Sequence, residues 1–145
     1  MARGAIYFPT SGENIAAIVR FAEIIPGQKI ADLGSGDGRI LIVLARAGAE
    51  AHGYEINPIL VYRSRRAIKK AGLQGGAFVH WKSFWKVDTS SYSTVVVYGI
   101  PFIMDALGTK LKHELSPGAK VISNVFTFRN LGAGQSMGRV HRYSI

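Results

Sequence analysis

Apolar positions along the 145-residue chain follow two repeats, one typical of helices and the other typical of buried strands. Apolar residues three or four positions apart predict helices, whereas short runs rich in β-branched residues predict strands buried on both faces. The helical patterns cover residues 15–25, 38–47, 58–71 and 102–115. The strand patterns cover residues 29–33, 50–55, 77–80, 95–98 and 120–126. In the tail we expect a loop over residues 129–138 and an edge strand over residues 139–145.

The regular alternation of strands and helices predicts the α/β class, with a Rossmann-like, doubly wound and mostly parallel sheet. Glycine and proline residues separate the elements, as at Pro26-Gly27 and Pro117-Gly118. No internal repeat or linker divides the sequence, so we expect a single domain over residues 1–145. Ligands of such sheets bind beyond the carboxyl ends of the strands, and chemistry is therefore expected after Leu33.

Three alternating glycines follow the first predicted strand, at positions 34, 36 and 38. Glycine permits a tight turn with positive φ and lets a ligand approach the backbone. Asp37 is expected to cap the helix that follows, whose free N–H groups favour a ligand carboxylate or phosphate. Neither dinucleotide fingerprint nor P-loop is matched, because Arg39 stands where the third fingerprint glycine belongs and no Gly-Lys-Ser/Thr follows.

An acidic residue, Glu55, ends the second predicted strand. A carboxylate at this place can accept hydrogen bonds from both hydroxyls of a bound ribose. Either feature alone is compatible with an ordinary turn and an exposed glutamate. The glycine loop and Glu55 together predict a nucleoside site.

The net charge favours certain classes of binding partner, and the absence of cysteine excludes certain kinds of site. Eighteen Lys and Arg against nine Asp and Glu give a net charge of +9, which favours nucleic acid, an anionic membrane surface or an acidic protein. The chain has no cysteine, which excludes disulfides, thiolate metal sites and cysteine nucleophiles, and no metal site is predicted. No apolar run is long enough for a membrane span and no signal peptide is evident, so we expect a cytoplasmic protein.

The pattern Asp-x-Gly-x-Gly-x-Gly from Asp32, with an acid ending the next strand, resembles the class I, seven-strand S-adenosylmethionine-dependent methyltransferases. Longer segments narrow the resemblance to the protein-lysine methyltransferases that modify the ATP synthase c-subunit and the adenine nucleotide translocase. These segments are residues 7–10, 31–40, 53–58, 85–87 and 98–101. The resemblance covers about residues 6–126 and implies a minimal class I methyltransferase fold.

The resemblance implies S-adenosyl-L-methionine as the cofactor and a set of residues around it. The implied cofactor-binding residues are Thr10, Asp32, Gly34, Ser35, Gly36, Gly38, Glu55, Asn57 and Ser83. The glycine loop and Asp32 correspond to the methionine end, and Glu55 corresponds to the ribose. Ser83 departs from the family pattern, which commonly has an aspartate there to accept from the adenine amino group.

A lysine acceptor must be neutral to attack a methyl group, and an apolar channel lowers its pKa. The candidates for the walls of such a channel are Phe8, Trp85, Tyr98 and Pro101. Methyl transfer from a sulfonium needs positioning more than proton transfer, and no general base is nominated. Structural roles in the core are the competing interpretation for these side chains.

Three functions remain open from the sequence. The first is methylation of a lysine in a protein, with an acidic or membrane-associated protein as partner. The second is methylation of RNA or DNA, which suits the basic surface; the segment from Tyr98 to Pro101 lacks the Asn-Pro-Pro-aromatic motif of many base methyltransferases. The third is a cofactor-binding module without catalysis, which the intact glycine loop and Glu55 disfavour.

Overall fold

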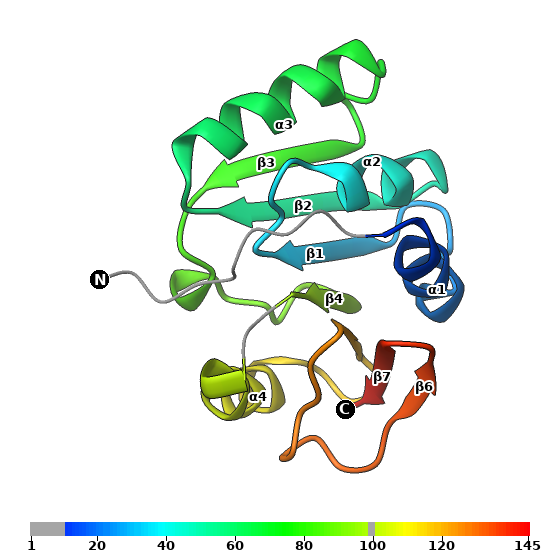
Figure 1. Ribbon diagram of the computed structural model, residues 1–145, viewed down its shortest axis with the longest axis vertical. Coiled ribbons are helices and arrows are strands. Elements are labelled where there is room, and N and C mark those ends of the chain that lie inside the picture. The colour runs from blue at the N-terminus through cyan, green and yellow to red at the C-terminus, as the bar shows by residue number, and fades with distance from the viewer. Residues whose placement is uncertain (1–10, 99–100) are drawn as a thin grey trace.

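The computed structural model, which describes residues 11–98 and 101–145, contains a seven-stranded sheet with helices on both faces (Figure 1). The strands are β1 (Lys29–Leu33), β2 (Glu50–Glu55), β3 (Ala77–Trp81), β4 (Thr94–Val97), β5 (Lys120–Asn124), β6 (Gln135–Met137) and β7 (Val140–Ser144). The helices are α1 (Gly12–Ala22), α2 (Arg39–Arg46), α3 (Pro58–Lys70), the 3-10 turn η1 (Phe84–Lys86) and α4 (Pro101–Glu114). In this part of the chain no helix combines the length and the apolar character that crossing a membrane requires.

The sheet is doubly wound, with the order β3-β2-β1-β4-β5-β7-β6. Strands β1 to β5 run parallel, and β7 enters antiparallel between β5 and β6. The chain order reverses between β1 and β4, which is the switch point where such sheets bind ligands. The sequence-based prediction of a mostly parallel, doubly wound sheet is therefore confirmed.

The central strands are buried on both faces, as their continuous apolar runs predict. Val96 faces a core formed with α1, α2 and α3, which includes Ile18, Leu41 and Ile68. Val95 and Val97 face the opposite core, which α4 covers. This packing fixes the carboxyl ends of β1, β2, β4 and β5 along one edge of the sheet, hereafter the carboxyl edge.

Two helix starts differ from the prediction because of their caps. Helix α1 begins three residues earlier than expected, since Ser11 Oγ accepts a hydrogen bond from Asn14 N, and it ends before Glu23, which has a left-handed φ of 48°. Asp37 does not cap α2, and that prediction is wrong. Gly38 holds the cap position with φ 85°, while Asp37 Oδ1 accepts from Arg39 N at 3.2 Å.

The tail departs most from the prediction. Strand β5 ends at Asn124 rather than at residue 126, because Val125 adopts φ 81° and turns the chain. The predicted loop contains the short strand β6. The expected edge strand is in fact internal, because β7 pairs with both β5 and β6. A three-residue strand with two exposed polar residues carries no apolar repeat that a sequence pattern could reveal.

Two histidines on the sheet have structural partners. His52 Nδ1 lies 2.9 Å from His80 Nε2, and His52 Nε2 lies 2.8 Å from Glu50 Oε2. Burial, together with nearby positive charge including His52, lowers the pKa of His80. These histidines pack among Phe78, Tyr54 and Tyr92 and belong to the sheet surface rather than to its carboxyl edge.

Candidate functional site

The glycine loop after β1 forms the tight turn that the sequence predicts. Gly34, Gly36 and Gly38 have φ values of 83°, 59° and 85°, a region that side chains with a Cβ rarely adopt. Gly34 N and Ser35 N both donate to Tyr54 O, at 2.9 and 3.2 Å. The loop is therefore held by the backbone of the neighbouring strand β2, and its inner surface can be approached closely by a ligand.

Glu55 lies directly against this loop at the end of β2. Its Oε1 accepts from Gly36 N at 2.9 Å, and its Oε2 accepts from Asn57 N at 2.9 Å. Each carboxylate oxygen has a second acceptor position, so two ribose hydroxyls can bind without displacing these contacts. Asn57 uses its side-chain oxygen to cap α3, accepting from Ile59 N and Leu60 N. A direct contact between the Asn57 side chain and a cofactor stays a prediction.

Asp32 is the most perturbed carboxyl group at the site. Burial, followed by the charges of Glu55 and Asp37, raises its pKa to about 7. Its Oδ2 is buried and has no hydrogen-bond partner among the described residues, and the same holds for Ser35 Oγ. Ser35 Oγ packs against Gly53 of β2, where a Cβ would lie 2.6 Å from it. Buried polar atoms are nearly always paired, so the unpaired carboxylate oxygen of Asp32 points to a polar ligand.

Ser64 holds the loop from α3, and the sequence interpretation missed it. Its Oγ lies 2.8 Å from both Gly36 O and Leu60 O, to which the hydroxyl donates. A Cβ at Gly38 would lie 3.1 Å from Ser64 Cβ, so the two elements are in close contact. The sequence does place Ser64, a small polar residue, on the apolar face of α3 between Leu60 and Ile68. The many basic residues of this helix drew the interpretation to its exposed face instead.

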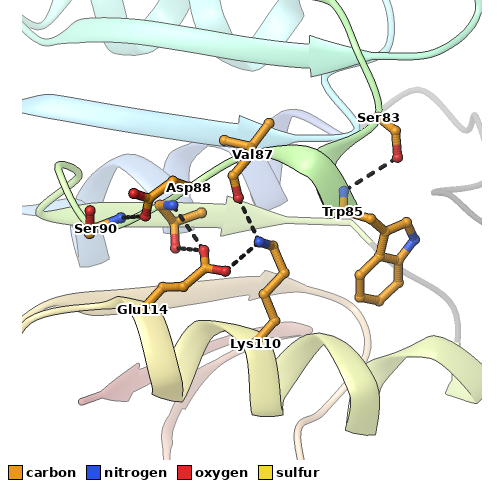
Figure 2. Close-up of polar contacts among 8 residues, drawn as sticks. Ser83, Trp85, Val87, Asp88, Ser90, Lys110 and Glu114 are labelled. Carbon is orange, nitrogen blue, oxygen red and sulfur yellow. Dashed lines mark hydrogen bonds and ion pairs between the residues drawn. The ribbon is translucent and has the colours of Figure 1, made fainter.

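Ser83 and Trp85 lie at η1, beyond β3. Ser83 Oγ accepts from Trp85 N at 3.3 Å (Figure 2). The Trp85 ring packs against Phe84 and the core that α4 covers. Lys110 Nζ on α4 fixes the following segment by donating to Val87 O and by pairing with Glu114, each at 2.5 Å (Figure 2). The predicted roles of Ser83 near adenine and of Trp85 in a channel stay predictions.

A groove of about 720 Å³ opens beside the switch point, at the carboxyl ends of β4 and β5. Its described lining residues are Ser11, Glu13, Asn14, Ala16, Ala17, Arg20, Tyr98, Asn124, Val125, Met137, Gly138 and Arg139. Asn14 Nδ2 donates to the buried Asn124 Oδ1 at 2.9 Å and closes the groove between α1 and β5. Val125, on the same wall, is a β-branched residue with φ 81°, which is rare and costly.

The residues predicted to line one substrate channel do not lie together in the part of the chain that the structure describes. Tyr98 lines the groove, with its ring edge-on to Phe126 at 6.2 Å. Pro101 lines a neighbouring cavity of about 440 Å³ together with Phe102. Phe8 and Thr10 lie outside the described residues. Asn14, Asn124 and Val125 were not predicted, because they come from segments that are far apart in the sequence and meet only in the folded sheet.

The glycine loop after β1, together with Asp32 and Glu55, is hereafter the cofactor side. It fits S-adenosylmethionine, the cofactor that the sequence resemblance implies. The unpaired Asp32 Oδ2 suits an ammonium group, and the carboxylate of Glu55 suits the two ribose hydroxyls. The groove lies at the carboxyl ends of β4 and β5. It is next to the glycine loop, because β4 pairs directly with β1, the strand that precedes the loop. The arrangement can therefore hold a charged nucleoside and present it to a second molecule.

Comparison with known sequences gives a consistent family. The sequence model of the ANTKMT methyltransferase domain matches residues 32–134. The chain is 40% identical over 122 residues to the ATP synthase c-subunit lysine N-methyltransferase of Rattus norvegicus, covering 84% of this chain and 56% of the relative. It is 32% identical over 125 residues to a protein-lysine N-methyltransferase of Saccharolobus islandicus, covering 85% of this chain and 78% of the relative. The chain thus spans about half the length of the rat relative and most of the archaeal one.

A solved structure extends the match to nearly the whole chain. An RNA methyltransferase of Salinibacter ruber, crystallised with S-adenosyl-L-homocysteine, superposes with a TM-score of 0.88 at 31% identity. The alignment covers 95% of this chain and 94% of that one. The predicted class I methyltransferase fold is confirmed by this neighbour. Together with the family match over residues 32–134, it shows that the chain belongs to the ANTKMT methyltransferase domain family.

Proposed function

We propose that this protein transfers methyl groups from S-adenosylmethionine to the ε-amine of a lysine in another protein. The observation that carries the proposal is the adjacency of two sites, the glycine loop with Glu55 and the groove at Tyr98. Protein-lysine N-methyltransferases are named among its relatives from both animals and archaea, and this supports the choice of acceptor.

The residues of the cofactor side have distinct tasks in this mechanism. Glu55 accepts from the ribose, the glycine loop follows the methionine portion, and ionised Asp32 pairs with the ammonium group. The bound cofactor supplies a methyl group already activated by the positive sulfonium. Positioning of this kind contributes roughly 7–11 kcal/mol to such a reaction.

The residues of the groove orient the acceptor. Tyr98, Val125 and Met137 contribute apolar surface to the groove, and two arginines against one glutamate make its charged lining net positive. Desolvation and positive charge both favour the neutral, nucleophilic form of a lysine. The Tyr98 ring can also attract the methylated cation through its face. The amine nitrogen forms the new bond to the methyl carbon as the carbon–sulfur bond breaks, and its proton passes to solvent.

RNA is the second candidate substrate. The Salinibacter ruber neighbour is described as an RNA methyltransferase, and the chain carries a net charge of +9. The charge of the groove does not decide between the substrates, because its lining contains Arg20 and Arg139 as well as Glu13. The choice of protein over RNA rests on the lysine N-methyltransferases named among the relatives. We infer that the partner is a protein, either acidic or membrane-associated, because the excess of basic residues suits both.

Labelled methyl transfer into a cell lysate tests the proposal. The purified protein is incubated with lysate and cofactor carrying a labelled methyl group, and the products are digested separately with protease and with nuclease. We expect protease-sensitive label that acid hydrolysis releases as methylated lysine. The Glu55→Ala protein, which lacks the ribose acceptor, is the negative control. Label that resists protease and disappears with nuclease would establish RNA or DNA as the substrate instead.

A further inference from the structure

Three large apolar side chains are exposed together beside the carboxyl edge of the sheet. Ile59 and Tyr62 on α3 are 62% and 64% exposed, and Trp81 at the end of β3 is 66% exposed. We call these three residues the apolar patch. We leave Ile56 out of the apolar patch because it directly follows Glu55 and therefore lies at the cofactor side. Phe102 is excluded because it lines the cavity at Pro101.

One hydrogen bond places Trp81 near the helix that carries the other two members of the apolar patch. Trp81 Nε1 donates to Ile56 O at 3.0 Å, which satisfies the polar group of the indole and places it beside the start of α3. Ile59 and Tyr62 are three residues apart on α3 and therefore share one face of the helix. In Figure 1 the arrowheads of β1, β2 and β3 point to the side of the molecule on which α3 begins.

The stretch of sequence that carries the apolar patch is rich in basic residues and contains no acidic one. Between Ile56 and Val87 the sequence contains neither Asp nor Glu. The cations of this stretch are all exposed: Arg63, Arg65, Arg66, Lys69, Lys70, Lys82 and Lys86. Arg65 also donates to Val79 O at 2.9 Å, which keeps α3 against β3. Single exposed apolar residues are ordinary, but an aromatic and aliphatic group within a stretch rich in basic residues marks an interaction site.

We propose that the apolar patch and its surrounding cations dock this protein on an anionic lipid surface. Tryptophan and tyrosine favour the lipid–water interface, and lysine and arginine gain from anionic headgroups. Ile59 distinguishes lipid from RNA, because an aliphatic side chain gains from insertion among acyl chains and offers no ring for base stacking. Docking in this way brings the carboxyl edge, with the loop and the groove, close to the lipid.

Vesicle flotation tests the docking surface without any methyl transfer, so its outcome is independent of the proposed enzymatic function. The purified protein is mixed with phosphatidylcholine vesicles that either contain or lack phosphatidylglycerol. We expect flotation with the anionic vesicles only, decreasing with salt. Ile59→Ser and Trp81→Ser should each lower the partition coefficient about tenfold. Arg66→Gln should lower it about fivefold.

The chain offers a matched control in Ile25, which is 69% exposed and precedes β1 at the opposite edge. Ile25→Ser should leave flotation unchanged. Trp81→Phe, which keeps one aromatic ring but loses the indole N–H and part of the apolar area, should weaken binding less than Trp81→Ser, and melting curves report whether each variant folds. Equal flotation with neutral vesicles, or equal losses for Ile25→Ser and Ile59→Ser, would overturn the proposal. It is also overturned if an RNA oligomer binds, vesicles do not, and only the charge variants weaken the RNA complex.

Discussion

Polar contacts on the cofactor side of the carboxyl edge join the neighbouring elements β1, β2 and α3. At the groove, hereafter the acceptor side, one contact instead joins α1 to β5, far apart in the sequence. Glu55 accepts from Gly36 N, and Ser64 donates to Gly36 O. On the acceptor side the bond from Asn14 to Asn124 joins positions 110 residues apart in the sequence. The cofactor side is thus a local unit of β1, β2, α2 and α3, while the groove depends on the docking of α1 and the tail.

The difference matches the different demands of the two ligands. A cofactor that is the same in every turnover is served by a loop whose geometry is set before binding, which reduces the entropy lost on binding. The groove has a wall at Val125 that is held in a strained conformation. Strain of this type persists only where surrounding contacts impose it, here the bond from Val125 N to Arg139 O and the contact between Val125 O and His141 Nε2.

The largest effect should follow from Glu55→Ala. This change removes the acceptor for both ribose hydroxyls and also the bonds that hold Gly36 N and Asn57 N. Two hydrogen bonds to a charged group correspond to a loss of about 1,000-fold in cofactor affinity. Titration calorimetry with S-adenosylmethionine measures this loss. Glu13→Ala, which removes a carboxylate from the groove, is the matched control and should leave cofactor affinity nearly unchanged; an equal loss would show that the two sides are not separate.

The next effect concerns Asp32 and is visible as a change of stability with pH. The pKa of Asp32 in the folded protein is about 7, against 3.8 as the ordinary value. Because the folded-state pKa is raised, protonated Asp32 contributes stability that is complete below about pH 4 and is lost as pH rises through 7. Asp32→Asn cannot lose a proton, so it should be more stable than the parent at pH 8, by up to about 4 kcal/mol.

Denaturant unfolding at several pH values checks this prediction. The parent and the Asn variant should have similar stability near pH 4 and diverge progressively up to pH 8. A divergence in the opposite direction would mean that ionised Asp32 is stabilised by its surroundings. Adding S-adenosylmethionine should reduce the pH dependence of the parent, because a cation beside Asp32 favours its ionised form.

The acceptor side can be tested separately by Asn14→Ala. Loss of the bond to Asn124 should open the contact between α1 and β5 and lower kcat/KM for methyl transfer about tenfold, which corresponds to one partly buried hydrogen bond. Cofactor affinity should change less than twofold, since the glycine loop is untouched. Steady-state kinetics and calorimetry on the same preparation give both values. A large loss of cofactor affinity would show that α1 also shapes the cofactor side.

The difference between the cofactor side and the acceptor side also explains which features could be predicted from the sequence. The glycine turn at positions 34, 36 and 38 was evident from the sequence, because its residues and Glu55 stand in one short strand–helix–strand unit, and the structure places Glu55 against the loop. Their roles in binding the cofactor stay predictions. The five parallel strands were likewise evident from their apolar runs. Asn14, Asn124 and Val125 carry no local pattern, and their meeting depends on how α1 packs against β5.

The tail shows the same limit for the fold itself. The place of β7 between β5 and β6 follows from pairing partners that an apolar repeat does not encode. Its residues Val140 and Tyr143 are buried, yet the same pattern is compatible with an edge strand. The helix cap at Gly38 was misassigned to Asp37 because residue preference favours aspartate, whereas the loop geometry requires the positive φ of glycine.

The smallest expected effect is that of Ser64→Ala, which tests whether the geometry of the glycine loop is fixed before the cofactor binds. Ser64→Ala removes a hydroxyl that bonds to both Gly36 O and Leu60 O, and it should lower the free energy of unfolding by about 1 kcal/mol. Cofactor affinity should also fall a fewfold, because Gly36 O loses its support from α3. Thr109→Ala is the matched control. Thr109 Oγ1 also makes two hydrogen bonds, donating to Asp105 O and accepting from Asn130 Nδ2, and it touches no part of the loop. If the two variants lose stability and neither changes affinity, the loop geometry depends on β2 alone, through Tyr54 O and Glu55.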